Sequence, residues 1–277
     1  MPVRIVQSKQ NGRLKELRQA MAHPGRDARG LAAIEGPILL GEALRAGLRI
    51  DCAFVAQEAQ HLLDRLHLAP ETDVLLVPSQ LLTSALATET PQPIAALVEP
   101  IDWIWRNILD GAVDSPKQTS PLIVVLAGLQ DPGNLGTIIR SAEAFGATGI
   151  VCLPGTVSAW NPKAVRASAG SVFRVPLLDI NAQEAFAHLR QARVKIFTTA
   201  LRDAEPADRA DLAGPVALLI GNEGNGVPAE LAAQANAAVT IPCPGPVESL
   251  NASVAASVLL YEASRQRSAK MTSREPR

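Results

Sequence analysis

The segment GLQDPGNLGTIIR, residues 128–140, carries the first side chains whose types and spacing suggest chemistry. Gly128 and Gly133 have the spacing of the two glycines of a phosphate-binding loop, and a short apolar run precedes them as a strand would. The Lys and the Ser or Thr that such a loop needs next are replaced by Asn134 and Leu135. These replacements disfavour a P-loop nucleotide hydrolase, an alternative that an ATP-binding assay can exclude.

We expect Arg140 to lie about one turn into a helix that begins near Gly136, close to this loop. A guanidinium there can hold a phosphate or a carboxylate in a planar fork. Taken by itself, the loop is equally consistent with Arg140 as a surface or salt-bridge residue.

Two further loops follow apolar runs. In GNEGNGVP, residues 221–228, Glu223 stands among glycines that let the backbone approach a ligand or adopt positive φ, although a plain turn also explains the motif. In PCPGPVESLNAS the prolines forbid regular structure before Ser249, Leu250 and Asn251 enter a helix of small residues. Core packing alone would explain that helix.

The elements that must position these loops follow from an alternation of short apolar runs with helical patterns. Over the second half of the chain this alternation predicts an α/β fold with a parallel sheet, helices on both faces and a ligand at the carboxyl ends of the strands. A similar but shorter alternation begins near residue 30, and a Gly-, Asp-, Ser- and Pro-rich stretch separates the two. The expected division is a first domain at 1–100, a linker at 101–121, a second domain at 122–267 and a basic tail at 268–277.

Composition excludes several classes of protein. The sequence has no long apolar run and its first residues lack an apolar signal core, so we expect a cytoplasmic protein without a membrane span. The three cysteines and four histidines are dispersed, and we therefore expect neither a metal site nor a disulfide framework. Trp103 and Trp105 are expected to pack between the domains, with stacking on a base as the alternative.

The net charge is −1, but the basic residues are unevenly placed. A local basic face can supply phosphate contacts even in a neutral protein, while a solvated helix surface explains the same pattern. The residues concerned near the two ends of the chain are Arg4, Lys9, Arg13, Lys15, Arg18, Arg26 and Arg29, and Arg265, Arg267, Lys270, Arg274 and Arg277.

Together and in this order, the three loops resemble the three motifs of the SpoU/TrmH branch of the SPOUT RNA methyltransferases. Residues 131–146 follow the pattern D-P-x-N-x-G-x-x-x-R-x-A-x-x-F-G, and residues 220–226 and 241–255 follow the second and third motifs. The resemblance covers about residues 122–267. The first domain more loosely resembles an L30e-like substrate-binding domain with a T-x-T-P-Q-G segment, from which this chain departs at Pro93.

The resemblance implies a fold and a set of ligands that spacing does not show. It implies a deep trefoil knot formed by the C-terminal segment, S-adenosylmethionine as cofactor, and a homodimer whose interface includes the small-residue helix. The residues that it implies at the cofactor are Gly221, Ile241 and Leu250, with Thr199 and Asn222 as neighbours.

The resemblance also implies the reaction, methylation of an RNA ribose 2′-hydroxyl, and its catalytic residues Arg140, Asn134, Glu223, Ser249 and Asn251. Because a guanidinium stays protonated, we expect Arg140 to act electrostatically on the phosphate and the developing oxyanion, with water or Glu223 as the late proton acceptor. The expected substrate is 23S ribosomal RNA, with transfer RNA as the alternative and neither DNA nor a membrane as a partner. A catalytically silent RNA-binding scaffold of the same fold is the other alternative.

Overall fold

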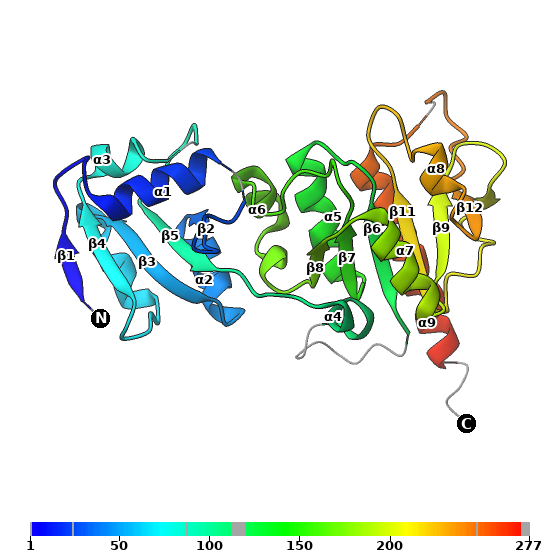
Figure 1. Cartoon of the computed structure of the whole chain (residues 1–277), viewed down its shortest axis with the longest axis horizontal. Coiled ribbons are helices and arrows are strands. Elements are labelled where there is room, and N and C mark those ends of the chain that lie inside the picture. Colours follow the sequence, from blue (N-terminus) through cyan, green and yellow to red (C-terminus); the bar gives the residue numbers. More distant parts are fainter. Residues whose placement is uncertain (1, 24, 87, 112–119, 248, 273–277) are drawn as a thin grey trace. The chain divides into compact units, whose positions relative to one another are not determined.

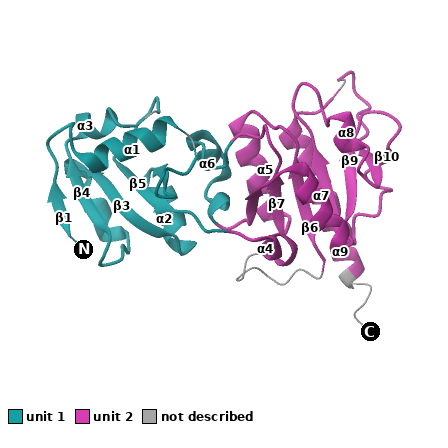
Figure 2. Ribbon diagram, viewed as in Figure 1, with its two compact units in different colours: residues 1–102, 158–173 teal, residues 103–157, 174–277 magenta. Residues whose placement is uncertain are grey.

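A computed structural model describes residues 2–23, 25–86, 88–111, 120–247 and 249–272. It divides the chain into two compact units, which Figure 2 colours separately. Unit 1 contains residues 1–102 and 158–173, and unit 2 contains residues 103–157 and 174–277. Within the expected linker, residues 112–119 lie outside the described residues, as do residues 273–277 of the expected basic tail.

Unit 1 is built on a five-stranded mixed sheet of order β1-β4-β3-β5-β2. Strand β5 runs antiparallel to β2 and β3, and the other pairings are parallel. The apolar runs from residue 30 to 100 do form strands, as predicted. The bounds are β1 Val3–Ile5, α1 Gly12–Ala22, β2 Ala32–Glu35, α2 Pro37–Arg45, β3 Arg49–Ala56, η1 Gln57–Arg65, β4 Asp73–Val77, α3 Ser79–Thr83 and β5 Ile94–Glu99.

Residues 158–173 lie between the two stretches of unit 2 in the sequence but belong to unit 1. The sequence division assigned them to the second domain. They contain helix α6, Pro162–Ser168, and the short 3-10 helix η2, Ser171–Phe173. Helix α6 packs against β2, and Trp160 stacks on Phe173 at 5.9 Å between ring centroids. Gly170 has φ +91°, and a Cβ there would lie 2.7 Å from the Cβ of Glu42. The absence of a side chain thus permits the close packing of this segment within unit 1.

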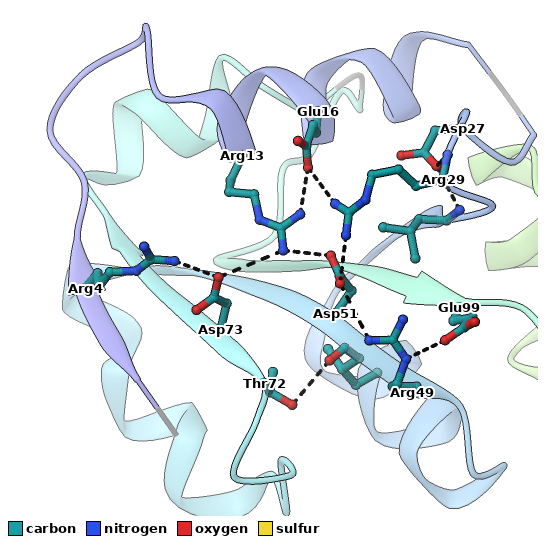
Figure 3. A network of polar contacts seen from close by, with 12 residues as sticks. Arg4, Arg13, Glu16, Asp27, Arg29, Arg49, Asp51, Thr72, Asp73 and Glu99 are labelled. Carbon is teal, nitrogen blue, oxygen red and sulfur yellow. Dashed lines mark hydrogen bonds and ion pairs between the residues drawn. The ribbon is translucent and has the colours of Figure 1, made fainter.

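Much of the basic N-terminal surface is neutralised by acids of the same unit. We call this cluster the unit 1 ion-pair network, and Figure 3 shows Asp51 between three arginines. Asp51, whose side chain is 9% exposed, contacts Arg13 at 2.8 Å, Arg29 at 3.1 Å and Arg49 at 3.6 Å. The complete network consists of Arg4, Arg13, Glu16, Arg29, Arg49, Asp51, Asp73 and Glu99. Arg4, Arg13 and Arg29 are therefore not the free cations that the composition suggested.

Unit 2 contains a seven-stranded sheet of order β10-β12-β9-β11-β6-β7-β8 (Figure 1). Over the described residues every strand pairing in this sheet is parallel, which confirms the predicted α/β class with a parallel sheet. The strand bounds are β6 Leu122–Leu126, β7 Gly149–Cys152, β8 Leu177–Asp179, β9 Lys195–Thr199, β10 Glu205–Pro206, β11 Val216–Ile220 and β12 Ala237–Thr240.

Helices cover both faces of this sheet. One face packs against α4, Trp105–Asp110, α7, Ala182–Gln191, and α8, Ala229–Ala232, in a single buried apolar cluster. Helices α5, Pro132–Ala144, and α9, Ala252–Thr272, pack on each other and supply no residue to that cluster, so they occupy the other face. Trp105 stacks on His188 of α7 at 4.6 Å between ring centroids, a contact within unit 2.

The C-terminal helix is anchored at the amino edge of the sheet. The Arg267 guanidinium donates to the carbonyl oxygens of Ser120 at 2.7 Å and Pro121 at 2.8 Å, and to that of Gly214. Burial lowers the pKa of Arg267 to about 10, so it remains charged at neutral pH. Helix α9 continues to Thr272, past the expected domain end at 267. No helix in the described parts of the chain is long and apolar enough to cross a membrane.

Candidate active site

The first motif places Asn134 inside a helix and not in a loop. Helix α5 begins at Pro132, because the Asp131 side chain caps it by accepting the Asn134 backbone N–H at 2.8 Å. The expectation that the helix begins near Gly136 is wrong. The Asp-Pro pair was a readable signal for this start, since Asp is a favoured cap and Pro a favoured first helical residue.

Glu223, in the loop after β11, holds this helix start from outside. Its carboxylate accepts the Asn134 Nδ2–H at 3.0 Å, the Asp131 backbone N–H at 3.1 Å and the Gln130 backbone N–H at 3.3 Å. Desolvation by itself raises the pKa of Glu223, but these hydrogen bonds outweigh it and keep the pKa below the ordinary value. Glu223 is therefore an ionised anchor at neutral pH and a weak proton acceptor.

Asn251, from the third motif, completes a chain of side chains across three loops. Its Nδ2–H donates to Asn134 Oδ1 at 3.1 Å, while its Oδ1 accepts the Ser253 backbone N–H at 2.9 Å at the start of α9. The Asn134 amide thus donates to Glu223 and accepts from Asn251. We call the chain Glu223–Asn134–Asn251 the Asn134 bridge. It joins the carboxyl ends of β6, β11 and β12, as the motif positions predicted.

The loop after β11 folds tightly on itself. Asn222 and Gly226 exchange backbone hydrogen bonds at 2.9 and 3.0 Å, and a Cβ on Gly221 would lie 2.1 Å from the Gly226 carbonyl carbon. The Asn222 side chain donates to the Gly128 carbonyl oxygen at 2.9 Å and accepts the Gly224 N–H at 2.8 Å. Only glycine at 221 permits this loop, and the Asn222 amide ties it to the first motif.

Among the described residues, the remaining predicted residues make no hydrogen bond with the Asn134 bridge. Thr199 ends β9, the strand between β11 and β12, and its hydroxyl donates to the Leu219 carbonyl oxygen at 3.2 Å. Ile241 and Leu250 are half-buried in the segment that leads from β12 to α9, and Ser249 beside them is exposed.

Arg140 lies farther along helix α5 than the sequence suggested. Because α5 begins at Pro132, Arg140 is more than two turns in, about 9 Å along the axis from Asn134 and on a different side of the helix. Its side chain is exposed, and within the described residues it has no hydrogen bond or ion pair. The bridge therefore makes no hydrogen bond to Arg140, and the guanidinium is available to a ligand.

The bridge has the chemistry of a positioning device. It offers amides, one ionised carboxylate and a glycine-rich backbone, and it includes no Cys or His nucleophile. Among the described residues no group of three or more His, Cys, Asp or Glu side chains is placed to hold a metal ion. Such a site suits group transfer between two bound molecules, because the protein then has to align the reactants and supply charge.

Unit 2 is a parallel-sheet α/β unit with three polar loops at the carboxyl ends of its strands, the edge at which such sheets bind ligands. Residues 121–261 match the SpoU rRNA Methylase family, and residues 11–96 match the MRM3-like substrate binding domain. The chain belongs to the SpoU rRNA methylase family.

Individual relatives resemble this chain over nearly its whole length. The 23S rRNA (guanosine(2553)-2′-O)-methyltransferase RlmP of Bacillus subtilis is 30% identical over 256 residues, covering 92% of this chain and 97% of that protein. The AdoMet-bound rRNA methyltransferase from Sinorhizobium meliloti is 31% identical with a TM-score of 0.79, covering 95% of this chain and 98% of its own. The SpoU methyltransferase AviRb from Streptomyces viridochromogenes, solved with AdoMet, is 27% identical with a TM-score of 0.80, covering 93% of this chain and 98% of its own.

Proposed function

We propose that this protein transfers a methyl group from S-adenosylmethionine to a ribose 2′-hydroxyl of 23S ribosomal RNA. The observation that carries the proposal is the Asn134 bridge, which joins all three motif loops at one edge of the unit 2 sheet. RlmP is named for 2′-O-methylation of a guanosine in 23S rRNA, and the match to it spans nearly both chains. Those two facts favour ribosomal RNA over transfer RNA and an enzyme over a silent scaffold.

The proposed cofactor contacts are Gly221, Ile241 and Leu250, with Thr199 and Asn222 beside them. The loop after β11 fits this role, because its glycines allow the main chain to approach a ligand closely. Gly221 has the further role of letting the loop close on Gly226. The AdoMet-bound structures of two relatives support it. When bound, the cofactor supplies a methyl group on a positively charged sulfur.

The chain's own residues align the ribose and supply charge. We assign the orientation of the ribose to Asn134, Glu223, Asn251 and the exposed Ser249. Arg140 neutralises the adjoining phosphate and stabilises negative charge on the 2′-oxygen, since its guanidinium stays protonated. Water takes the proton, because the hydrogen bonds that lower the pKa of Glu223 make its carboxylate a poor acceptor.

Unit 1 is the proposed RNA-binding unit, with the L30e-like fold that the motif comparison implied. Its match to the MRM3-like substrate binding domain supports this role. We also infer the deep trefoil knot in unit 2, formed as residues 241–272 pass through the preceding loop. Its support is that the segment from β12 to α9 brings Asn251 back to the start of α5. A cytoplasmic location follows from the proposed substrate.

A homodimer through α5 and α9 is part of the proposal. Between these helices lies a groove of about 340 Å³ that is open to solvent and lined mostly by apolar atoms. Val254 and Tyr261, at 47% and 55% exposure, leave apolar surface beside it. Sedimentation analysis tests this point: a dimer that Tyr261→Glu dissociates supports it, and a wild-type monomer at micromolar concentration contradicts it.

The test of the function is methyl transfer from labelled S-adenosylmethionine to 23S rRNA and to transfer RNA, each purified from cells that lack this protein. Nucleoside analysis then locates the label. Label in a 2′-O-methylated nucleoside of 23S rRNA supports the proposal, and label in transfer RNA alone supports the alternative substrate. Cofactor binding with no label in either RNA or in precursor ribosomal particles supports the scaffold.

A further inference from the structure

Thr156 lies in the turn after β7, outside the three motifs, yet its hydroxyl contacts the first motif loop. The hydroxyl oxygen accepts the Gly128 backbone N–H at 3.2 Å and its proton is donated to the Leu126 carbonyl oxygen at 3.1 Å. Directly after it, the Val157 N–H donates to the Leu129 carbonyl oxygen at 2.8 Å. The chain after β7 thus runs beside the loop that leads from β6 to α5.

Gly128 is the residue through which this contact reaches the candidate active site. It has φ +75°, and its two peptide groups are fixed from two sides, the N–H by the hydroxyl and the carbonyl oxygen by Asn222. The same loop then supplies the N–H groups of Gln130 and Asp131 that donate to Glu223. The Thr156 hydroxyl therefore holds the start of this loop, and the end of the same loop holds the Glu223 carboxylate.

Loss of the hydroxyl would leave the Gly128 N–H without its partner in a half-buried position. An unmade hydrogen bond at such a place is costly, and the loop can recover one only by moving. Movement of residues 128–131 would displace the donors of Glu223 and with them the Asn134 bridge.

We propose that Thr156 is a positioning residue of the active site, holding the loop at residues 128–131 so that Glu223 and Asn134 keep their geometry. The proposal rests on the proposed methyltransferase function. Thr156 itself lies behind the loop and acts on the substrate only through Gly128.

Thr148 provides a matched control at the opposite end of the same two strands. Its hydroxyl accepts the Leu122 N–H at 3.2 Å and donates to the carbonyl oxygens of Ile108 at 2.7 Å and Leu122 at 3.1 Å. It precedes β7 and touches the first residue of β6, whereas Thr156 follows β7 and touches the last. Thr148 is almost fully buried, so its replacement destabilises the unit without reaching the motif loops.

The experiment compares Thr156→Val, Thr156→Ser and Thr148→Val in the full chain with 23S rRNA and labelled cofactor. For Thr156→Val we expect kcat to fall about tenfold while KM for RNA stays within about twofold, because alignment and not RNA affinity is lost. Thr156→Ser keeps the hydroxyl and should restore kcat, and Thr148→Val should lower Tm but not kcat. Equal kcat values for the two valine variants, or no rescue by serine, would overturn the proposal.

Backbone amide exchange of the peptide covering residues 128–131 gives a second readout that needs no activity. Exchange should be faster in Thr156→Val than in wild type and unchanged in Thr148→Val. If wild-type protein methylates no RNA, the proposed function fails, and exchange still decides the role of Thr156 in the loop. Unchanged exchange in Thr156→Val would overturn that role as well.

Discussion

The two polar clusters of this molecule are built on different principles. The unit 1 ion-pair network pairs four arginines with four carboxylates, and one of these carboxylates, Asp51, contacts three of the arginines. The Asn134 bridge in unit 2 has one carboxylate, satisfied by N–H donors, and the one cation of its motifs, Arg140, is exposed without a described partner. An arginine is available to an anionic ligand when the fold leaves its charge without an acidic partner, as at Arg140 and not in the unit 1 ion-pair network.

The largest expected effect is on the methyl-transfer rate, when the exposed charge of Arg140 is removed. Arg140→Ala should lower methyl transfer about 10³-fold, the scale of losing one preorganised charge at a developing oxyanion. Arg49→Ala, in the unit 1 ion-pair network, is the matched control and should change the rate only a few-fold, because its charge is already paired with Glu99 and Asp51. Single-turnover transfer measures both. Similar losses in the two variants would contradict a special role for Arg140.

Arg140→Lys tests whether the planar shape of the guanidinium matters in addition to its charge. A lysine keeps the charge but not the planar fork, so we expect a rate well below wild type that is flat with pH. Wild-type activity near neutral pH would show that the fork is not needed, and a rate that climbs steeply with pH would favour a titrating base at this position.

The next effect concerns the cofactor loop. Gly221→Ala introduces a Cβ that would lie 2.1 Å from the Gly226 carbonyl carbon, so the loop must open and affinity for S-adenosylmethionine should fall about 100-fold. Gly214→Ala, before the same strand, is the control, since a Cβ there meets nothing within 4 Å. Titration calorimetry measures both affinities. Unaltered binding by Gly221→Ala would remove this loop from the cofactor site.

A smaller effect follows from the lowered pKa of Glu223. A depressed folded-state pKa means that Glu223 contributes stability above its ordinary pKa, about 4.3, and loses that contribution as pH falls through the lower folded value. The single-turnover rate should therefore show no inflection from Glu223 between about pH 5 and 8. An inflection in that range that Glu223→Gln abolishes would identify Glu223 as the titrating base, contrary to our assignment.

The smallest predicted effect returns to unit 1. Asp51→Asn should lower the free energy of unfolding by about 1–2 kcal/mol, because a nearly buried acid with three cationic partners loses its charge. It should also strengthen salt-sensitive, non-specific RNA binding, since arginine charge is released. Glu99→Gln, at an exposed acid with one arginine partner, should change stability by less than about 0.5 kcal/mol. Urea titration and filter binding at two salt concentrations distinguish the variants.

The strands of the buried parallel sheet could be predicted from the sequence. Runs such as Leu122–Leu126 and Val216–Ile220 are continuously apolar because strands of a covered parallel sheet face the core on both sides. The three motif loops were also placed at strand ends, and the Asn134 bridge confirms that they meet. The start of α5 was readable from Asp131 and Pro132 but was taken for part of the loop.

Other features depend on partners far along the chain and carry no local signal. The apolar residues of 158–173 have the same pattern whichever unit they join, so their place in unit 1 could not be predicted. The neutralisation of Arg13 and Arg29 depends on Asp51, which only the folded sheet brings to them. Thr156 was missed because a threonine after a strand is common, and only the structure shows its contact with Gly128.

The most direct test of the account is the single-turnover methyl-transfer rate of Asn134→Asp, alone and combined with Glu223→Gln. An aspartate at position 134 keeps the oxygen that accepts from Asn251, but its carboxylate repels that of Glu223. In the double variant the glutamine side chain at position 223 can donate an N–H to that aspartate, which restores a hydrogen bond between the two positions. We predict a loss of about 100-fold in the single variant and a recovery of about tenfold in the double variant. Wild-type rates in both variants would contradict the claim that the Asn134 bridge forms the active site.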